Sequence, residues 1–525
     1  MSVSLLAMAP NSATIWIAVP MLICFFALMI GVGIACRKHA TNVDNFVLGG
    51  RSVGPWLTAF AFGTSYFSAV IFVGYAGQFG WNFGLASTWI GLGNAFIGSL
   101  LAWMVLGRRT RLMTQHLGSK TMPDFFEKRY DSAKLKIFAS LIIFLFLIPY
   151  TASLYNGLSS LFNNVFSIPY WAVVLIMAVL TGIYVIFGGY MATAINDFIQ
   201  GIVMLVGIVA VVLAVLHDNG GLATAVKSLG EAAGSEYVSA LGPNPIFLLF
   251  VVLLTSLGTW GLPQMVGKFY SIKDEKSVKT GTIISTVFAV VVAGGCYFLG
   301  GFGKLYQDKM LESGYITETG VLFDKVIPTM LSDLAPIIVA VVIVLVLSAS
   351  MSTLSSLVLT SSSTLTLDVI KPTVQKKKEF TEQKSVLVMR LFIVFFIAVS
   401  AVIAILKDSI WKDSVFIAQM MGVSWGALAG SFLAPFLYGL FWKKGTRAAV
   451  AACFVFGTGL EIIQLCLSMK WFSFSNSILS FIFTNSLYSG VFAMVGGLLL
   501  FPLLSLLTQK TKPEKTDEKF SCITK

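Results

Sequence analysis

The chain has 525 residues, of which 57% are hydrophobic and 11% charged, and its mean hydropathy is +0.86. This composition excludes a water-soluble globular protein and a disordered one, and it indicates a protein embedded in a lipid bilayer. The net charge of +12 would suggest a nucleic-acid partner in a soluble protein. Here the basic residues cluster between apolar segments and report membrane orientation, so no nucleic-acid partner is expected.

Apolar segments of about twenty residues or more recur along the chain, which is the length that a helix needs to cross a bilayer. The first segment is followed at once by Arg37 and Lys38 and is expected to be a retained helix rather than a signal peptide. We predict an all-α membrane protein with about thirteen transmembrane helices, at 14–36, 54–76, 82–106, 134–161, 168–187, 193–216, 245–266, 280–303, 333–366, 386–406, 413–441, 447–469 and 483–508.

The basic residues predict the orientation of these helices. Most of the 36 Lys and Arg residues fall in alternate connections, with clusters at 108–111, 376–378 and 443–444. By the positive-inside rule these connections are cytoplasmic, so the N-terminus lies outside and the C-terminus inside. The charged segment 509–525 is expected to be a disordered cytoplasmic tail.

Enzymatic chemistry finds little support in the sequence. The connections between the predicted helices are too short for a soluble catalytic domain, and neither HExxH nor the Walker motif GxxxxGK occurs. The three histidines fall in or beside loops, which argues against a buried histidine proton relay. We therefore expect a transporter rather than an enzyme, with no organic cofactor.

Two predicted helices contain a patch that is unusual for a simple span. Residues 62–69 read FGTSYFSA, and residues 255–263 read TSLGTWGLP. Small residues also permit close helix packing, so each patch alone has an ordinary explanation. However, the patches lie five helices apart, and paired interrupted helices in corresponding positions indicate a transporter built from inverted repeats.

The segment 333–366 is rich in hydroxyl side chains. Ala349, Ser352, Thr353 and Ser356 share one helix face, because they are spaced at i, i+3, i+4 and i+7. Two hydroxyls and the freed carbonyls of a broken helix would suit a hard monovalent cation such as sodium. The alternative is that these hydroxyls bond to their own helix and support packing.

Two acidic residues fall in predicted spans. Asp197 lies near the start of the helix at 193–216, where it would serve as a helix cap or lie on an ion exit route. Glu461 lies deeper, in the helix at 447–469, outside the two five-helix units. We expect a structural or protein–protein role for Glu461.

Several motifs resemble the sodium:solute symporter family, whose members include sodium/proline, sodium/pantothenate and sodium/sugar transporters. They are DNFVLGGRS at 44–52, GGY at 188–190 with ND at 196–197 and QG at 200–201, GLP at 261–263 and MST at 351–353. The resemblance implies a LeuT-like fold of two inverted five-helix repeats in a single transmembrane domain. It places an extra helix at 14–36, repeat 1 at 54–216, repeat 2 at 245–441, two further helices at 447–508 and the tail at 509–525.

The resemblance also implies a coupling-ion site and an exit route. Sodium would be held by the backbone carbonyls of Thr64, Phe67 and Ala349 and by the hydroxyls of Ser352 and Thr353. Asp197 stands where the family has an aspartate linked to sodium release toward the cytoplasm. This set includes the hydroxyl face derived above from helix spacing.

The solute is less well specified. The chain departs from the proline transporters it resembles at Tyr66, Thr255 and Thr259, and other stretches are more similar to the pantothenate branch. No intramembrane Lys or Arg is expected at the site. From position and polarity, candidate solute contacts are Tyr66, Ser68, Thr255, Thr259, Trp260, Tyr150 and Asn156.

The expected function is sodium-coupled uptake of a small organic solute, either a carboxylate such as pantothenate or an amino acid such as proline. Uptake would proceed by alternating access in a bacterial inner membrane. The alternatives are a proton-coupled symporter using Asp197 or Glu461, a sodium channel or sensor, and a sugar symporter.

Overall fold

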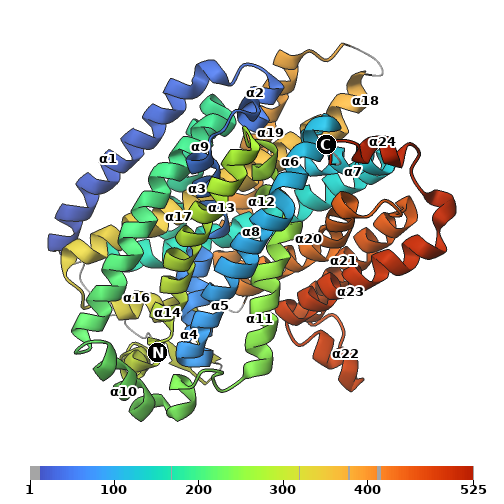
Figure 1. Cartoon of the computed structure of the whole chain (residues 1–525). Helices are drawn as coiled ribbons and strands as arrows, with labels where there is room; N and C mark the ends of the chain where they lie inside the picture. The colour runs from blue at the N-terminus through green and yellow to red at the C-terminus, as the bar shows by residue number, and fades with distance from the viewer. Residues whose placement is uncertain (1–11, 167, 319, 376–378, 411–415, 524–525) are drawn as a thin grey trace.

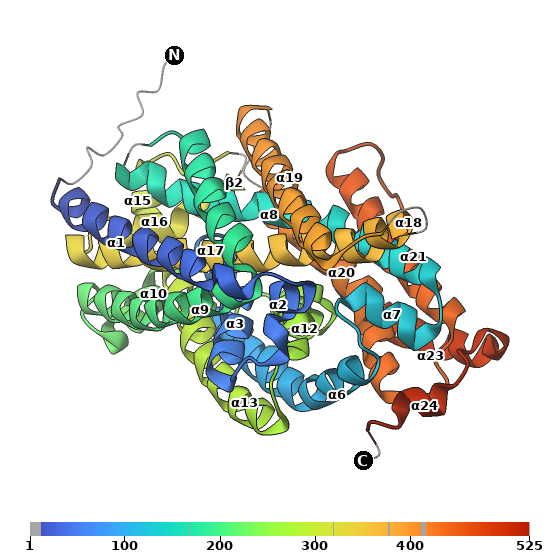
Figure 2. The same cartoon turned by 90° about the horizontal axis from the view of Figure 1, so that it is seen from above.

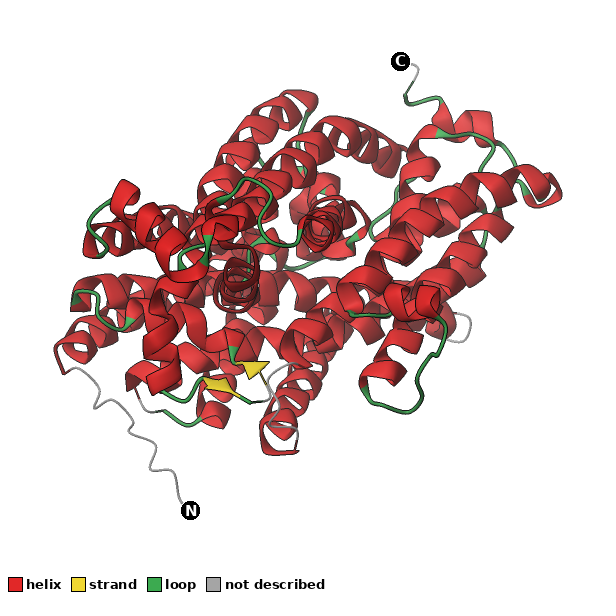
Figure 3. Ribbon diagram, turned by 90° about the horizontal axis from the view of Figure 1, so that it is seen from below, coloured by secondary structure: helices red, strands yellow, loops and turns green. Residues whose placement is uncertain are grey.

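The computed structural model describes residues 12–166, 168–318, 320–375, 379–410 and 416–523. Nearly all of the described chain is helical, apart from a small hairpin of strands β1 (Ile316–Thr317) and β2 (Gly320–Val321) (Figure 3). Ten helices in these ranges are long and apolar enough to cross a bilayer, or eleven when the bent pair Pro245–Gly261 and Pro263–Tyr270 is one span. The chain is therefore a multi-pass, all-α membrane protein.

The helices vary widely in length. Those of the first half are α1 (Ser12–Cys36), α2 (Val43–Leu48), α3 (Pro55–Tyr66), α4 (Ala76–Phe83), α5 (Thr88–Gly93), α6 (Arg108–His116), α7 (Met122–Tyr130), α8 (Ala133–Phe166) and α9 (Tyr170–Asp218). Those of the second half are α10 (Leu222–Ala233), α11 (Pro245–Leu257), α12 (Pro263–Tyr270), α13 (Glu275–Ala289), α14 (Gly295–Gly300), α15 (Gln307–Glu312), α16 (Val326–Leu331), α17 (Pro336–Thr364), α18 (Lys371–Gln375), α19 (Glu382–Ile410), α20 (Phe416–Phe441), α21 (Arg447–Ser468), α22 (Ser477–Ile482), α23 (Ser486–Leu507) and α24 (Thr516–Phe520).

Two of the apolar spans are much longer than a bilayer requires. Val70–His116, which contains α4, α5 and α6, has 47 residues, and α9 has 49. At about 1.5 Å per residue a straight helix of that length would reach roughly 70 Å, more than twice the hydrocarbon thickness. Each contains a glycine with positive φ, +59° at Gly84 and +54° at Gly189, where the helix changes direction.

The most buried spans are α17 and α20. Helix α17 packs against α1, α3, α8 and α9, and α20 packs against α21 and α23. Figures 1 and 2 show α20, α21 and α23 gathered on the side of the molecule opposite α1. Because protein rather than lipid surrounds α17, its many hydroxyl groups can be used for internal contacts.

The C-terminal segment is ordered as far as residue 523, which contradicts the expectation of a disordered tail. Helix α24 lies beside α6 and α7 (Figure 1), with Phe520 buried and its ring 4.8 Å from the Arg129 guanidinium. The Lys519 Nζ lies 2.6 Å from the Asp131 Oδ1. The charge pattern suggested a solvated tail, but one aromatic anchor and an ion pair hold it against the helical body.

Candidate functional site

Helix α3 stops in the middle of the protein. It ends at Tyr66, and Phe67 has the extended conformation of φ −100° and ψ +109°. The last carbonyls of a helix have no partner within that helix, so the break frees the carbonyls near Thr64. Thr64 and Phe67 are buried, which means that these polar groups need partners inside the protein.

Two hydroxyls of α17 supply such partners. The Ser352 hydroxyl lies 3.1 Å from the Thr64 carbonyl and 3.2 Å from the Ala349 carbonyl, and it can donate its single hydrogen to either. The Thr353 hydroxyl reaches the same two carbonyls at 3.3 and 3.1 Å. All four residues are fully buried. Four of the five oxygens predicted from the sequence therefore converge in space, and as neutral oxygens they suit a hard monovalent cation.

The fifth predicted ligand, the Phe67 carbonyl, lies at the same break. The Phe67 N–H donates to the Gly63 carbonyl at 3.1 Å. Across the described ranges, no hydrogen bond joins the Phe67 carbonyl to Ser352 or Thr353. The Phe67 carbonyl therefore stays a predicted ligand that lies near the cluster of four oxygens but is not joined to it.

The second interrupted helix is also broken, as its sequence predicts. Helix α11 continues as the turn η8 (Gly258–Gly261), Leu262 is extended, and α12 starts at Pro263 with a bend of 46°. Proline suits this first helical position because it has no N–H to leave unpaired. The Tyr66 hydroxyl donates to the Thr255 carbonyl at 2.5 Å and so connects the two broken helices.

Two of the candidate solute contacts lie beside an aromatic residue that the sequence did not single out, and a third, Ser68, lies near one of them. The rings of Tyr66 and Tyr150 lie 6.3 and 6.0 Å from that of Trp425 in α20. The Tyr150 hydroxyl faces Trp425 and Ser68. The hydroxyls of Ser68 and Tyr150 are buried, and neither forms a well-aligned hydrogen bond with a described residue. They are the polar groups best placed to receive a ligand.

The side chains of the remaining solute candidates are less free to bind a solute, because most of them already donate hydrogen bonds within the protein. The hydroxyls of Thr255 and Thr259 donate to backbone carbonyls of their own segment, at 2.8 and 2.7 Å. The Trp260 indole donates to the Ile97 carbonyl at 3.1 Å. Asn156 falls within α8, but its side chain lies outside the described residues.

Asp197 lies inside α9, eight residues after the kink at Gly189, and does not cap a helix. Its carboxylate is fully buried and lies 3.5 Å from the Lys268 Nζ. The sequence did not predict this buried lysine, and its partner is Asp197 rather than one of the solute candidates. Lys268 was placed beyond a helix ending at 266, whereas α12 restarts at Pro263 and carries it back into the protein. A helix restart after the GLP break was the signal that could have revealed it.

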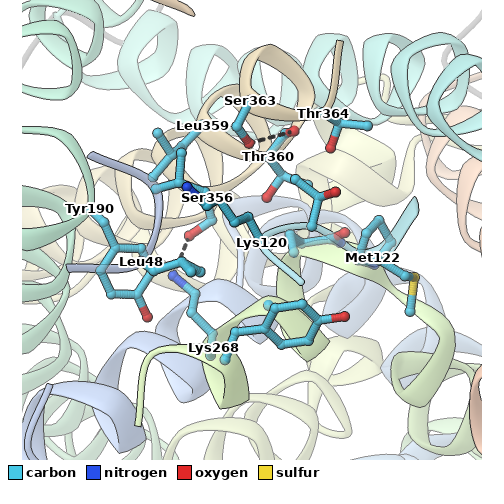
Figure 4. Close-up of a pocket in the computed structure, with 16 residues that line it drawn as sticks. Leu48, Lys120, Met122, Tyr190, Lys268, Ser356, Leu359, Thr360, Ser363 and Thr364 are labelled. Atoms are coloured by element: carbon cyan, nitrogen blue, oxygen red, sulfur yellow. Dashed lines mark hydrogen bonds between the residues drawn. The ribbon is translucent and has the colours of Figure 1, made fainter. Parts of the chain in front are cut away.

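A cavity adjoins Lys268. It is lined by residues of α9, α12 and α17 and of the segments around α2 and α7, among them Ser356, Thr360, Tyr190 and Lys120 (Figure 4). Figure 4 shows Lys268 and Ser356 on the same side of this cavity, joined by a hydrogen bond. Lys120, at another part of the lining, is partly exposed and pairs with Asp44 at 2.9 Å. The cavity therefore extends from the buried ion pair toward the end of the molecule that carries α6 and α7.

Glu461 makes a local contact away from this region. Its carboxylate is fully buried and accepts a hydrogen bond of 2.9 Å from the Ser489 hydroxyl, linking α21 to α23. This contact fits the structural role expected for it.

Comparison with known proteins decides the family. Residues 46–457 match the model of the sodium:solute symporter family. The chain belongs to the sodium:solute symporter family. It is therefore a transporter that couples movement of a solute to sodium. Sodium/proline symporters of Staphylococcus aureus strains JH9 and COL are 30% identical to it over 469 residues, covering 86% of this chain and 86% of each relative.

Solved structures of transporters share the fold of this symporter. A Na⁺-coupled sialic acid symporter, solved in a substrate-bound outward-open state, has a TM-score of 0.72 at 17% identity, covering 94% of this chain and 98% of the other. A manganese transporter of Eremococcus coleocola has a TM-score of 0.52 at 14% identity, covering 87% and 94%. At these identities the likeness concerns the fold, which is that of LeuT-like transporters.

Proposed function

We propose that this symporter imports a small organic carboxylate or amino acid together with sodium, which binds between α3 and α17. The observation that carries the ion site is the convergence of the Thr64 and Ala349 carbonyls with the hydroxyls of Ser352 and Thr353. The Phe67 carbonyl would complete five ligands after a small shift of the extended segment. Sodium would replace the hydroxyl-to-carbonyl hydrogen bonds by direct coordination.

The solute would bind beside the two broken helices, around Tyr66, Ser68, Tyr150 and Trp425. Free backbone N–H groups and the positive end of a half-helix favour a carboxylate. The sodium/proline symporters that are 30% identical support an amino acid such as proline, and pantothenate remains the other candidate. A sugar is less well supported, because the aromatic cluster offers few hydrogen-bonding side chains.

The proposed topology has thirteen crossings. Dividing the two overlong spans at Gly84 and Gly189, and joining each interrupted helix across its break, turns the candidate spans into that number. Two inverted repeats at 54–216 and 245–441 would then follow one extra helix at 14–36 and precede two at 447–508. The basic segments support a cytoplasmic C-terminus and an N-terminus outside the inner membrane.

Coupling would follow from the shared element α3. Sodium would order the break at 67–68, and the same break carries Tyr66 and Ser68 to the solute. Each ligand would then raise the affinity of the other by the same factor. Alternating access would open the side of α6 and α7, where sodium leaves past Asp197. One charge moving through 100 mV supplies roughly 2.3 kcal/mol before any concentration term.

The test is thermal unfolding of the purified protein with proline, pantothenate, monocarboxylates, sialic acid and sugars, each in sodium and in potassium at fixed pH. A solute that raises the melting temperature only in sodium identifies the substrate and the coupling ion together. Stabilisation that follows pH and ignores sodium would instead favour proton coupling through Asp197 or Glu461.

A further inference from the structure

The carboxylate of Asp197 is buried and has almost no polar partners among the described residues. It is fully buried in α9, and within the described part of the chain neither of its oxygens accepts a hydrogen bond. Lys268 is its single ion-pair partner in that part, with the Nζ at 3.5 Å from Oδ2. A buried carboxylate that is ionised and has no counter-charge is strongly unfavourable, so Asp197 in its ionised form needs a cation beside it whenever the site is closed to water.

The ammonium of Lys268 is held as a small cation would be held. It donates to the Ser356 hydroxyl at 2.9 Å, and its Nζ lies 5.4 Å from the centre of the Tyr190 ring. A carboxylate oxygen, a hydroxyl and an aromatic face thus surround one positive charge. A carboxylate and a hydroxyl are also ligands that an alkali cation accepts.

This position adjoins the proposed sodium site. The Ser356 hydroxyl forms a 2.7 Å hydrogen bond with the Ser65 hydroxyl, and Ser65 follows Thr64 in α3. Ser356 also lies one helical turn after Ser352 on the same face of α17. A chain of contacts therefore runs from the sodium ligands through Ser65 and Ser356 to the Lys268 ammonium.

We infer that Lys268 is a tethered cation: its ammonium occupies a second cation position, formed by Asp197 and Ser356, beside the sodium site. By filling this position, Lys268 limits the transporter to one bound sodium ion. Two positive charges cannot share one buried carboxylate and hydroxyl without strong repulsion. This inference rests on the proposed function, since it takes the cluster of Thr64, Ala349, Ser352 and Thr353 as the site of the coupling ion.

The same contact explains how the exit would be controlled. Lys268 belongs to α12, the second half of the broken helix, and it lines the cavity on the side of Ser356 (Figure 4). A sodium ion leaving toward Asp197 must displace the ammonium from the carboxylate. Displacement would release α12 from α9 and α17, and the return of the ammonium would neutralise Asp197 after the ion has left.

The test is equilibrium binding of radioactive sodium to the purified full-length protein. The wild-type protein and Lys268→Arg are expected to bind about one sodium ion per chain, because each retains a cation on Asp197. Lys268→Met should bind about two, and Lys268→Met combined with Asp197→Asn should return to about one. Lys120→Met is the control, since Lys120 lines the same cavity but pairs with Asp44. This substitution should leave the number of bound sodium ions at about one per chain.

Other outcomes distinguish this inference from the proposed function. Absence of sodium binding by the wild-type protein overturns the proposed sodium site itself. One sodium ion bound by both wild type and Lys268→Met overturns the tethered cation and leaves the proposed function standing. If Lys268→Met is too unstable to titrate, Lys268→Gln replaces it, and its melting temperature should rise more steeply with sodium than that of wild type, whereas an equal slope contradicts the inference.

Discussion

At the scale of single residues, the hydroxyls of Ser352 and Thr353 each lie within hydrogen-bond distance of two carbonyl oxygens, one on their own helix and one on α3. In the ordinary interior of a helix, a Ser or Thr hydroxyl bonds only to its own turn. The link to the Thr64 carbonyl is possible because α3 ends two residues later. Residue identity on α17 and the break in α3 therefore have to act together to form the ion site.

We expect Thr353→Ala to raise the sodium concentration needed for half-maximal binding about tenfold, because one of the few ligands is removed from a dry site. Sodium titration of thermal unfolding measures this effect. Thr353→Ser should restore the affinity. Ser362→Ala is the matched control, since the Ser362 hydroxyl donates to the Leu359 carbonyl of its own helix at 3.2 Å. Equal sodium requirements in Thr353→Ala and wild type would remove this residue from the site.

Tyr66→Phe should weaken the coupling between sodium and solute without abolishing either binding event. The substitution removes the hydrogen bond from the Tyr66 hydroxyl to the Thr255 carbonyl, worth about 1 kcal/mol, so the mutual enhancement should fall about fivefold. Affinity for the solute is measured with and without sodium. Tyr438→Phe is the control, because its hydroxyl makes the same kind of bond, to the Leu498 carbonyl at 3.0 Å, between α20 and α23. An equal loss in both variants would contradict a specific role for Tyr66.

The sequence predicts the residues of the ion cluster better than those around the solute. Helix spacing alone places Ser352 and Thr353 on one face, and the family motif identifies their partners. Trp425 was not predicted, because an aromatic residue in an apolar helix has no pattern that separates solute contact from packing. Lys268 was missed because hydropathy ends a span at the first charge, whereas a broken helix returns its second half to the protein interior.

At the scale of elements, the breaks determine where polar backbone is available. Gly189 illustrates how local sequence produces one of them, since φ of +54° and ψ of −148° are accessible in practice only to glycine. The sequence marks this position with the pair Gly188–Gly189, and it predicted separate helices on either side. The backbone at Gly189 is non-helical, so α9 consists of two helical parts that meet at this kink.

Gly189→Ala should lower the stability of the protein by about 1–3 kcal/mol through backbone strain alone. A Cβ at this position would also meet the Phe46 ring and carbonyl at 2.9 Å, so α2 would have to shift. The melting temperature in detergent measures the loss. Gly459→Ala, in an α-helix with open space around the position, should be neutral or slightly stabilising. Similar melting temperatures for the two variants would contradict the strained kink.

At the scale of the whole molecule, the C-terminal segment connects parts that the sequence places far apart. Besides the Phe520 and Lys519 contacts, the Lys443 Nζ lies 2.6 Å from the Asp517 Oδ1. The hydrogen bond and charge of Lys443 hold the pKa of Asp517 below its usual value. Charge composition could not predict this packing, because it depends on one aromatic residue, Phe520, meeting Arg129, which is far away in the sequence.

Phe520→Ala should make the tail accessible to trypsin. Lys519 is 12% exposed in its side chain, so cleavage after it should be slow in the wild-type protein and many times faster once the aromatic anchor is removed. Mass spectrometry of timed digests measures both rates, with cleavage after the exposed Lys515 as an internal reference. Phe472→Ala, at a half-exposed position in another loop, should leave the rate unchanged. Rapid cleavage after Lys519 in wild type would show that the tail is not held.

Sodium-driven accumulation of a solute is the central claim for the whole molecule, and its most direct test is uptake into proteoliposomes. The labelled solute is the one that stabilises the purified protein in sodium, and an inward sodium gradient is compared with an equal potassium gradient at the same pH and membrane potential. Concentrative uptake should occur only with the sodium gradient and should be lost in Thr353→Ala at low sodium. Accumulation that proceeds equally in potassium, or that follows a proton gradient instead, would contradict sodium coupling at the site between α3 and α17.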